Sequence, residues 1–263
     1  EFKGFSFGAE HSASGEVVFN TGMVGYPESL TDPSYKGQIL VLTYPLIGNY
    51  GVPEKETEND LLRYFESENI QVKALIISDY SFEYSHWNAK KSLAEWLKEE
   101  SIPAIYGIDT RKLTKILREK GAMLGKIVFE NEEIKFYDPN GVDLVKEVTI
   151  KEPIIYNVKK DNKKVVVIDC GVKNNIIRNL IKRGLTVIRV PYDYDFLTQF
   201  FDGLIISNGP GDPKMCRTTI YNVGRALKHD IPTFGICLGN QLLALAAGGD
   251  TYKLKYGHRS QNQ

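Results

Sequence analysis

The stretch 233–246 reads TFGICLGNQLLALA. A short apolar run comes first, then Cys237 with a glycine two positions before it and another two positions after it, then a run of strong helix formers. This is the thiol form of the strand–turn–helix arrangement that presents a nucleophile on a sharp turn. Glycines are required where the strand end and the helix start approach so closely that side chains would collide. A helix N-terminus also stabilises negative charge on sulfur, so the stretch predicts an attacking cysteine.

The second half of the chain alternates short apolar runs with helical patterns. Strands are predicted at 165–169, 186–190, 203–207 and 232–236, and helices at about 174–183 and 221–227. This alternation is typical of a doubly wound parallel sheet, where ligands gather at the carboxyl ends of the strands. Cys237 and the loop 207–213 both follow such strands, so we expect them at that edge.

The first half has strands and helices in mixed order, without steady alternation. Strands are predicted at 16–19, 38–42 and 73–77. Helical spacing is seen in three sets of residues: Leu61, Leu62 and Phe65; Leu93, Trp96 and Leu97; and Leu113, Ile116 and Leu117, the last set after a candidate N-cap at 109–110. The order predicts an α+β domain. We expect this domain over 1–152, a polar linker over 153–163 and the second domain over 164–263.

Composition narrows the class of protein. A chain of 263 residues with 42% hydrophobic and 25% charged residues is long enough for two ordinary globular domains. Lysine plus arginine and aspartate plus glutamate both number 33, so net charge gives no reason to expect nucleic acid or a membrane as partner. The cysteines (Cys170, Cys216, Cys237) are odd in number and lack metal-ligand spacing, which favours a reducing compartment over disulfides or zinc. We expect a cytoplasmic protein without metal, the mitochondrial matrix being the alternative.

Taken singly, each motif has a plain structural interpretation. A lone cysteine is usually a small buried hydrophobe, and the loop Gly209-Pro210-Gly211 is by itself a tight turn. The two glycines also allow backbone N–H groups to face an oxyanion or an extended substrate. Both motifs at neighbouring strand ends together favour a catalytic site.

These motifs resemble a known family. NGPGDP at 208–213 and FGICLGNQL at 234–242 resemble the class I (triad) glutamine amidotransferases. In the first half, GEVVFNTGMVGYPE at 15–28, LTDPSY at 30–35, TYPLIGNYG at 43–51 and GIDTR at 107–111 resemble the small, glutamine-hydrolysing component of carbamoyl-phosphate synthetase. The resemblance covers essentially the whole chain and is closest to the eukaryotic type, in which this unit is fused to the synthetase.

The resemblance implies a mechanism. The Cys237 thiolate attacks the side-chain amide of glutamine, ammonia leaves, and water hydrolyses the glutamyl thioester. Ammonia then reaches synthetase domains of the ATP-grasp type, which use bicarbonate, ATP and Mg²⁺, while this chain itself carries no cofactor. Substrate binding and oxyanion stabilisation are implied for Gly209, Gly211 and the Leu238 N–H, and glutamine contacts for Gln241 and for Ser34 from the first domain.

The chain also departs from the family. A cysteine nucleophile needs a base, which the family takes from a Gly-His-Pro-Glu motif, with further substrate contacts from an Asn-His-Gly-Phe/Tyr segment; neither occurs here. His258 and His229 do not match the motif, and His86 and His11 belong to the first domain. We therefore expect a fragment of a larger protein whose amidotransferase domain is incomplete and which is inactive alone.

The residue Asn240 leaves the pathway open. Many bacterial and cytosolic relatives have histidine there, whereas the ammonia-dependent urea-cycle relatives have asparagine but lack the cysteine. The segments 79–81 and 86–87 also resemble the urea-cycle relatives more than the others. Both pyrimidine and arginine or urea biosynthesis stay open. So does a non-catalytic docking or regulatory role on an ammonia-dependent synthetase, whereas the first-domain motifs count against a peptidase-like thiol hydrolase.

Overall fold

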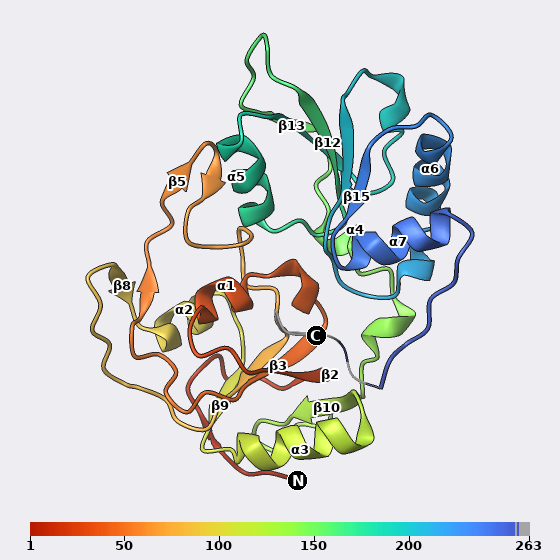
Figure 1. Cartoon of the computed structure of the whole chain (residues 1–263). Helices are drawn as coiled ribbons and strands as arrows, with labels where there is room; N and C mark the ends of the chain where they lie inside the picture. Colours follow the sequence, from red (N-terminus) through yellow and green to blue (C-terminus); the bar gives the residue numbers. More distant parts are fainter. Residues whose placement is uncertain (256, 258–263) are drawn as a thin grey trace.

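The computed structural model describes residues 1–255 and 257. Two β-sheets lie one above the other in Figure 1, the first built by the N-terminal half and the second by the C-terminal half. No helix among the described residues is both long and apolar enough to cross a membrane.

The N-terminal sheet has six strands with a parallel interior. Its order is β1 (Phe5–Ser6), β9 (Ala104–Tyr106), β7 (Ala74–Ile76), β3 (Gln38–Leu42), β2 (Ala13–Asn20) and β10 (Met123–Ile127). The pairs β2–β3, β3–β7 and β7–β9 are parallel, and only the edge strands β1 and β10 run antiparallel to their neighbours. The three predicted strands are present, but their parallel pairing was not deducible from the order of elements.

Both faces of this sheet are covered, because side chains on β3 alternate between two apolar clusters. Leu40 and Leu42 pack with α1 (Tyr26–Leu30) and α2 (Leu93–Glu99). Ile39 and Val41 pack with α3 (Thr110–Lys120). The helices predicted around 93–97 and 113–117 are confirmed, and Asp109 caps α3 by accepting a hydrogen bond from the Lys112 N–H.

The prediction of a helix from Leu61, Leu62 and Phe65 is wrong. Leu61–Leu62 is strand β6, which pairs with β5 (Thr57–Glu58) through a turn whose two residues, Asn59 and Asp60, both have positive φ. Such a turn closes a two-residue hairpin. Leu61 packs under the second sheet with Val165 and Val167, while Phe65 contacts the Trp96 ring. The helical spacing of these apolar residues therefore reflects contacts with distant elements rather than the buried face of a helix.

A second small ribbon pairs β4 (Val52–Pro53) with β8 (Ala89–Lys91).

The second sheet is doubly wound, as predicted. Its order is β11 (Ile154–Tyr156), β13 (Thr186–Pro191), β12 (Lys164–Asp169), β14 (Gly203–Ile206) and β15 (Thr233–Gly235), parallel except for β11. Helices α6 (Arg217–Leu227) and α7 (Leu238–Ala246) cover one face, and α5 (Asn174–Lys182) covers the other.

The segment between the sheets is more ordered than a polar linker suggests. β11 lies inside the stretch 153–163 and adds an antiparallel edge to the second sheet. Before it, α4 (Val145–Val148) places Val145 in the apolar cluster beneath α6 and α7. The described residues also form short 3-10 helices: η1 (Pro33–Tyr35), η2 (Pro139–Gly141), η3 (Phe196–Thr198) and η4 (Pro213–Met215). The domain limits at 152 and 164 stay a prediction.

Candidate active site

Cys237 lies on a sharp turn between β15 and α7. Its backbone has φ 54° and ψ −111°, a conformation that non-glycine residues rarely adopt. The neighbouring glycines are sterically required: a Cβ on Gly235 would lie 2.5 Å from the Asn240 nitrogen, and one on Gly239 would lie 2.1 Å from the Ile206 carbonyl oxygen. The tight packing predicted from the two glycines is thus present, and it leaves Cys237 exposed.

The loop 207–213, here called the glycine loop, lies directly beside the sharp turn at Cys237, here called the elbow. It follows β14, which pairs in parallel with β15, so both turns emerge at the carboxyl edge of the sheet. A Cβ on Gly209 would lie 1.9 Å from the Cys170 carbonyl oxygen and 2.9 Å from Leu238 Cδ2. Gly211 has φ 83° and so also needs the freedom of glycine. The structure therefore brings Gly209 beside Leu238, the residue after Cys237, while Gly211, two positions later in the loop, lies beside Leu144.

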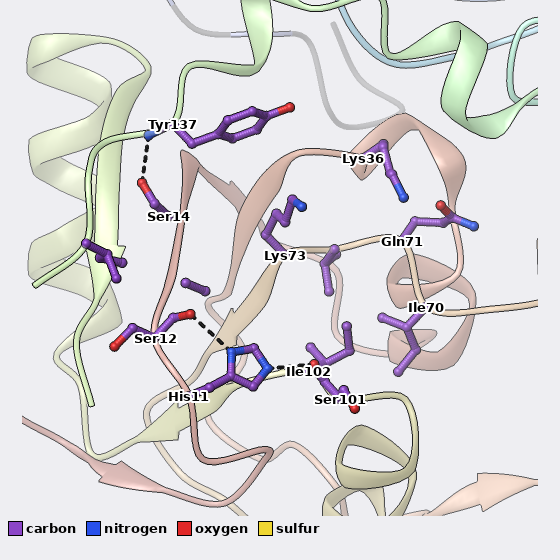
Figure 2. A pocket seen from close by; sticks show the side chains of 13 residues that line it. His11, Ser12, Ser14, Lys36, Ile70, Gln71, Lys73, Ser101, Ile102 and Tyr137 are labelled. Atoms are coloured by element: carbon purple, nitrogen blue, oxygen red, sulfur yellow. Dashed lines mark hydrogen bonds between the residues drawn. The ribbon is translucent and has the colours of Figure 1, made fainter. Parts of the chain in front are cut away.

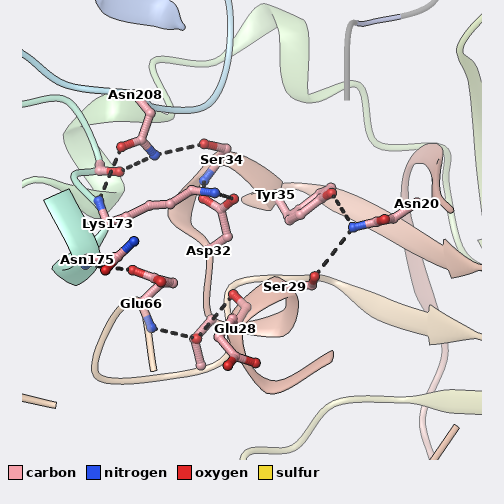
Figure 3. Close-up of polar contacts among 12 residues, drawn as sticks. Asn20, Glu28, Ser29, Asp32, Ser34, Tyr35, Glu66, Lys173, Asn175 and Asn208 are labelled. Carbon is pink, nitrogen blue, oxygen red and sulfur yellow. Dashed lines mark hydrogen bonds and ion pairs between the residues drawn. The ribbon is translucent and has the colours of Figure 1, made fainter. Parts of the chain in front are cut away.

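Ser34 reaches this loop from the first domain. The Asn208 amide nitrogen donates to Ser34 Oγ over 2.9 Å, although 174 positions separate the two residues in sequence. Figure 3 shows the contact between η1 and the loop after β14. The structure places Ser34 beside this loop, and the expected contact of Ser34 with substrate stays a prediction.

Gln241 lies in the first turns of α7 and is exposed. Its backbone N–H donates to the Cys237 carbonyl oxygen over 3.4 Å. Within the part of the chain that the structure describes, its side chain makes no hydrogen bond. It is free to contact a ligand from the helix that begins at the elbow.

Several contacts that hold this edge together were not assigned from sequence. Asp169, at the carboxyl end of β12, is fully buried and accepts hydrogen bonds from the backbone N–H groups of Gly171 and Val172. It also receives the Arg189 guanidinium at 2.8 Å. Burial alone would lower the pKa of Arg189, but the Asp169 charge and the contacts with Tyr156 together outweigh it, and that pKa is raised. In the sequence, only the position of Asp169 at the end of an apolar run hinted at this contact. Its partner Arg189 comes from another strand, which the sequence does not indicate.

No histidine among the described residues is placed beside Cys237 by a hydrogen bond or a shared loop. No hydrogen bond to its sulfur is found among residues 1–255 and 257. His229 precedes β15 and so lies at the opposite end of that strand from Cys237. His86 lies in the loop before β8, and His258 lies outside the described residues.

His11 belongs to a separate hollow in the first domain. Its ring nitrogens lie 3.1 and 2.9 Å from the carbonyl oxygens of Ser12 and Ser101. Figure 2 shows this hollow, of about 440 Å³, with Lys36 and Lys73 also on its wall. Its residues belong to the N-terminal sheet and its loops, so His11 is not part of the elbow.

The three thiols differ sharply in environment. Cys170 and Cys216 are free and buried, whereas Cys237 is free and exposed. Burial raises the pKa of Cys170, and it raises the pKa of Cys216 to about 12. Only the elbow thiol is therefore accessible to a substrate or reagent. No group of three or more His, Cys, Asp or Glu side chains within the described ranges is arranged to hold a metal ion.

Comparison with known proteins decides the family. The model of the carbamoyl-phosphate synthase small chain, CPSase domain, matches residues 1–127, and that of the class-I glutamine amidotransferases matches 166–263. The chain belongs to the carbamoyl-phosphate synthase small-chain family. Its second sheet is the class-I glutamine amidotransferase part.

Relatives in this family take several forms. The chain is 56% identical over its whole length to the multifunctional protein CAD of Squalus acanthias, covering 12% of that protein. It is 52% identical over its whole length to the mitochondrial carbamoyl-phosphate synthase [ammonia] of Aquarana catesbeiana, covering 18% of it. It is 51% identical, over 99% of its length, to the arginine-specific small chain of Saccharomyces cerevisiae, covering 66% of it. The chain thus spans about an eighth to a sixth of the first two relatives.

Proposed function

We propose that this chain is the glutamine-hydrolysing part of a carbamoyl-phosphate synthase. The Cys237 sulfur attacks the side-chain amide of glutamine, releases ammonia and forms a glutamyl thioester, which water then hydrolyses. The observation that carries the proposal is the exposed thiol on a strained elbow, with the glycine loop beside it and Ser34 across the domain boundary.

The neighbouring groups support specific roles. The Leu238 N–H at the start of α7 and the N–H groups of Gly209 and Gly211 are suited to an oxyanion and the substrate backbone. Ser34 and Gln241 are suited to hold the amino-acid end of glutamine. We propose that the base is the histidine of a Gly-His-Pro-Glu motif, as the family resemblance implies; residues 1–263 do not contain that motif, and His258 and His229 do not match it.

The proposed partner is a synthetase of the ATP-grasp type, either on the same polypeptide or as a large subunit. Ammonia from this site, bicarbonate and ATP would yield carbamoyl phosphate there, with ATP and Mg²⁺ bound by the synthetase. The support is the fused or multi-part character of relatives named multifunctional protein and small chain. We propose a cytoplasmic location, with the mitochondrial matrix as the alternative that the mitochondrial relatives raise.

The test compares two nitrogen donors in the full-length protein. Cys237→Ser should lower glutamine-dependent carbamoyl phosphate synthesis by roughly a thousandfold or more, the scale seen when hydrolases lose their nucleophile. Ammonia-dependent synthesis should stay within about twofold, because the synthetase is untouched. Equal loss with both donors would reject Cys237 as the nucleophile.

A second candidate is a docking or regulatory domain on an ammonia-dependent synthetase. Relatives named carbamoyl-phosphate synthase [ammonia] and the missing base around Cys237 favour it. An electrophilic glutamine analogue separates the two. Glutaminase chemistry predicts labelling of Cys237 alone, blocked by excess glutamine, with buried Cys170 and Cys216 as internal controls. A protein that is never labelled and does not use glutamine would be the docking domain.

A further inference from the structure

A buried amide links the glycine loop to both domains. Asn208 is 3% exposed, and its side chain makes three hydrogen bonds. Its Nδ2 donates to Ser34 Oγ and to the Gly171 carbonyl oxygen, both over 2.9 Å, and its Oδ1 accepts from the Lys173 N–H over 3.2 Å. Figure 3 shows this arrangement. One side chain thus fixes the β12–α5 loop, the β14 loop and η1 against one another.

The two backbone contacts decide which way the amide faces. A carbonyl oxygen can only accept and an N–H group can only donate. Turning the amide over would set oxygen against the Gly171 oxygen and NH₂ against the Lys173 N–H. The Nδ2 group therefore faces Ser34, and Ser34 Oγ is the acceptor in that bond.

The direction of this bond leaves the hydroxyl proton of Ser34 unused. A hydroxyl has one proton to donate in addition to its lone pairs. No acceptor for the Ser34 proton is found in the part of the chain that the structure describes. The proton therefore points away from Asn208 and is available to water or to an oxygen of a bound ligand.

The turn that carries Ser34 is held from a second side. The Ser34 N–H donates to Asp32 Oδ1 over 2.9 Å, and Lys173 Nζ lies 2.6 Å from Asp32 Oδ2. Asp32 is 5% exposed, so this ion pair is sheltered on its acidic side. Burial alone would lower the pKa of Lys173, but the Asp32 carboxylate, with Glu66 and Tyr35, outweighs it and the pKa is raised, which keeps the lysine charged. The segment 171–173 therefore fixes both the backbone and the hydroxyl of Ser34.

We propose that Asn208 is a positioning residue for glutamine binding: by donating to Ser34 Oγ it makes the hydroxyl a hydrogen-bond donor to a substrate oxygen, with a carboxylate oxygen of the amino acid as the favoured acceptor. This inference rests on the proposed function. It differs from a purely structural role, in which Asn208 would hold the domains together and leave glutamine affinity alone.

Reversing the polarity of the amide tests the inference in the full-length protein. In Asn208→Asp the carboxylate accepts the Ser34 proton, so the hydroxyl is lost to the substrate. The KM for glutamine should rise about tenfold to a hundredfold, with a smaller change in kcat. Ser34→Ala should raise KM by a similar factor, and the double variant should be no worse than the larger single effect.

A matched control tests whether the effect is specific to Asn208, and a second variant replaces Asn208→Asp if that variant does not fold. Asn222→Asp makes the same change at another buried amide, which donates to the Tyr194 carbonyl oxygen beside η3, and should leave the KM for glutamine unchanged. If Asn208→Asp does not fold, as judged by melting and ammonia-dependent synthesis, Asn208→Ala takes its place in the same double-variant cycle.

The outcomes separate this inference from the proposed function. KM increases that multiply in the double variant, or an unchanged KM in a folded Asn208 variant, would overturn the positioning role while glutamine hydrolysis by Cys237 stands. A wild-type protein that does not use glutamine at all rejects the proposed function, and the inference with it. Non-additive KM effects with ammonia-dependent synthesis intact support the inference.

Discussion

Arg189 contacts the fully buried Asp169 through two nitrogens: Nε and Nη2 lie 3.0 and 2.8 Å from the same oxygen, Oδ2. The other oxygen of Asp169 accepts from the N–H groups of Gly171 and Val172 over 2.9 and 2.8 Å. This carboxylate therefore orders the loop after β12. That loop includes Cys170, whose carbonyl oxygen lies where a Cβ on Gly209 would stand.

Removing the arginine should strongly destabilise the second sheet. Arg189→Met leaves a buried carboxylate without its cation, a change that costs about 3–5 kcal/mol in unfolding free energy. Denaturant unfolding measures it. Arg225→Met is the control, because its ion pair with Asp195 at 3.0 Å is exposed on both sides. It should cost about 0–1 kcal/mol. Equal costs for the two variants would contradict the role given to Asp169.

The elbow stores backbone strain that glycine relieves. Cys237 has φ 54° and ψ −111°, where a Cβ costs about 1–3 kcal/mol. Cys237→Gly should therefore be more stable than Cys237→Ala by about 1–3 kcal/mol in denaturant unfolding. Within α7, the exposed Ala244 provides the opposite control, because Ala244→Gly should destabilise by about 1 kcal/mol. Finding the glycine variant at position 237 no more stable than the alanine variant would mean that the elbow is unstrained.

Stability at acid pH should depend on Glu16, which is 6% exposed on β2. Burial alone would raise the pKa of Glu16, but Lys253 at 2.7 Å and the amides of Asn140 and Gln38 outweigh it and lower the pKa. A carboxyl whose folded-state pKa is lowered stabilises the fold above the unfolded-state pKa, about 4.3. That contribution is lost as pH falls through the folded-state pKa.

Melting temperature against pH checks this expectation. Below about pH 4, wild type should lose more stability than Glu16→Gln, which has no proton to take up at that position. Lys253→Met should fall between the two, because the amide donors to Glu16 remain. Parallel curves for wild type and Glu16→Gln would show that Glu16 does not contribute to acid sensitivity.

The sequence was sufficient to predict those parts of the structure that depend on interactions between neighbouring residues. Alternating apolar runs and helices predicted the second sheet, and the spacing of Gly235, Cys237 and Gly239 predicted the elbow. Both depend on steric and hydrophobic patterns within a few residues. The pattern at Leu61 and Leu62 misled for the same reason, because its apolar residues serve a hairpin packed under another domain.

The amino-acid sequence by itself determined the family, the two-part organisation and the cysteine on its sharp turn, because glycine requirements and strand alternation depend on neighbouring residues. Only the tertiary structure decided how the first domain meets the second. The Asn208–Ser34 bond, the Lys173–Asp32 ion pair and the Asp169–Arg189 contact join segments far apart in sequence. Their geometry follows from how the sheets pack and where loops emerge, which no local pattern specifies.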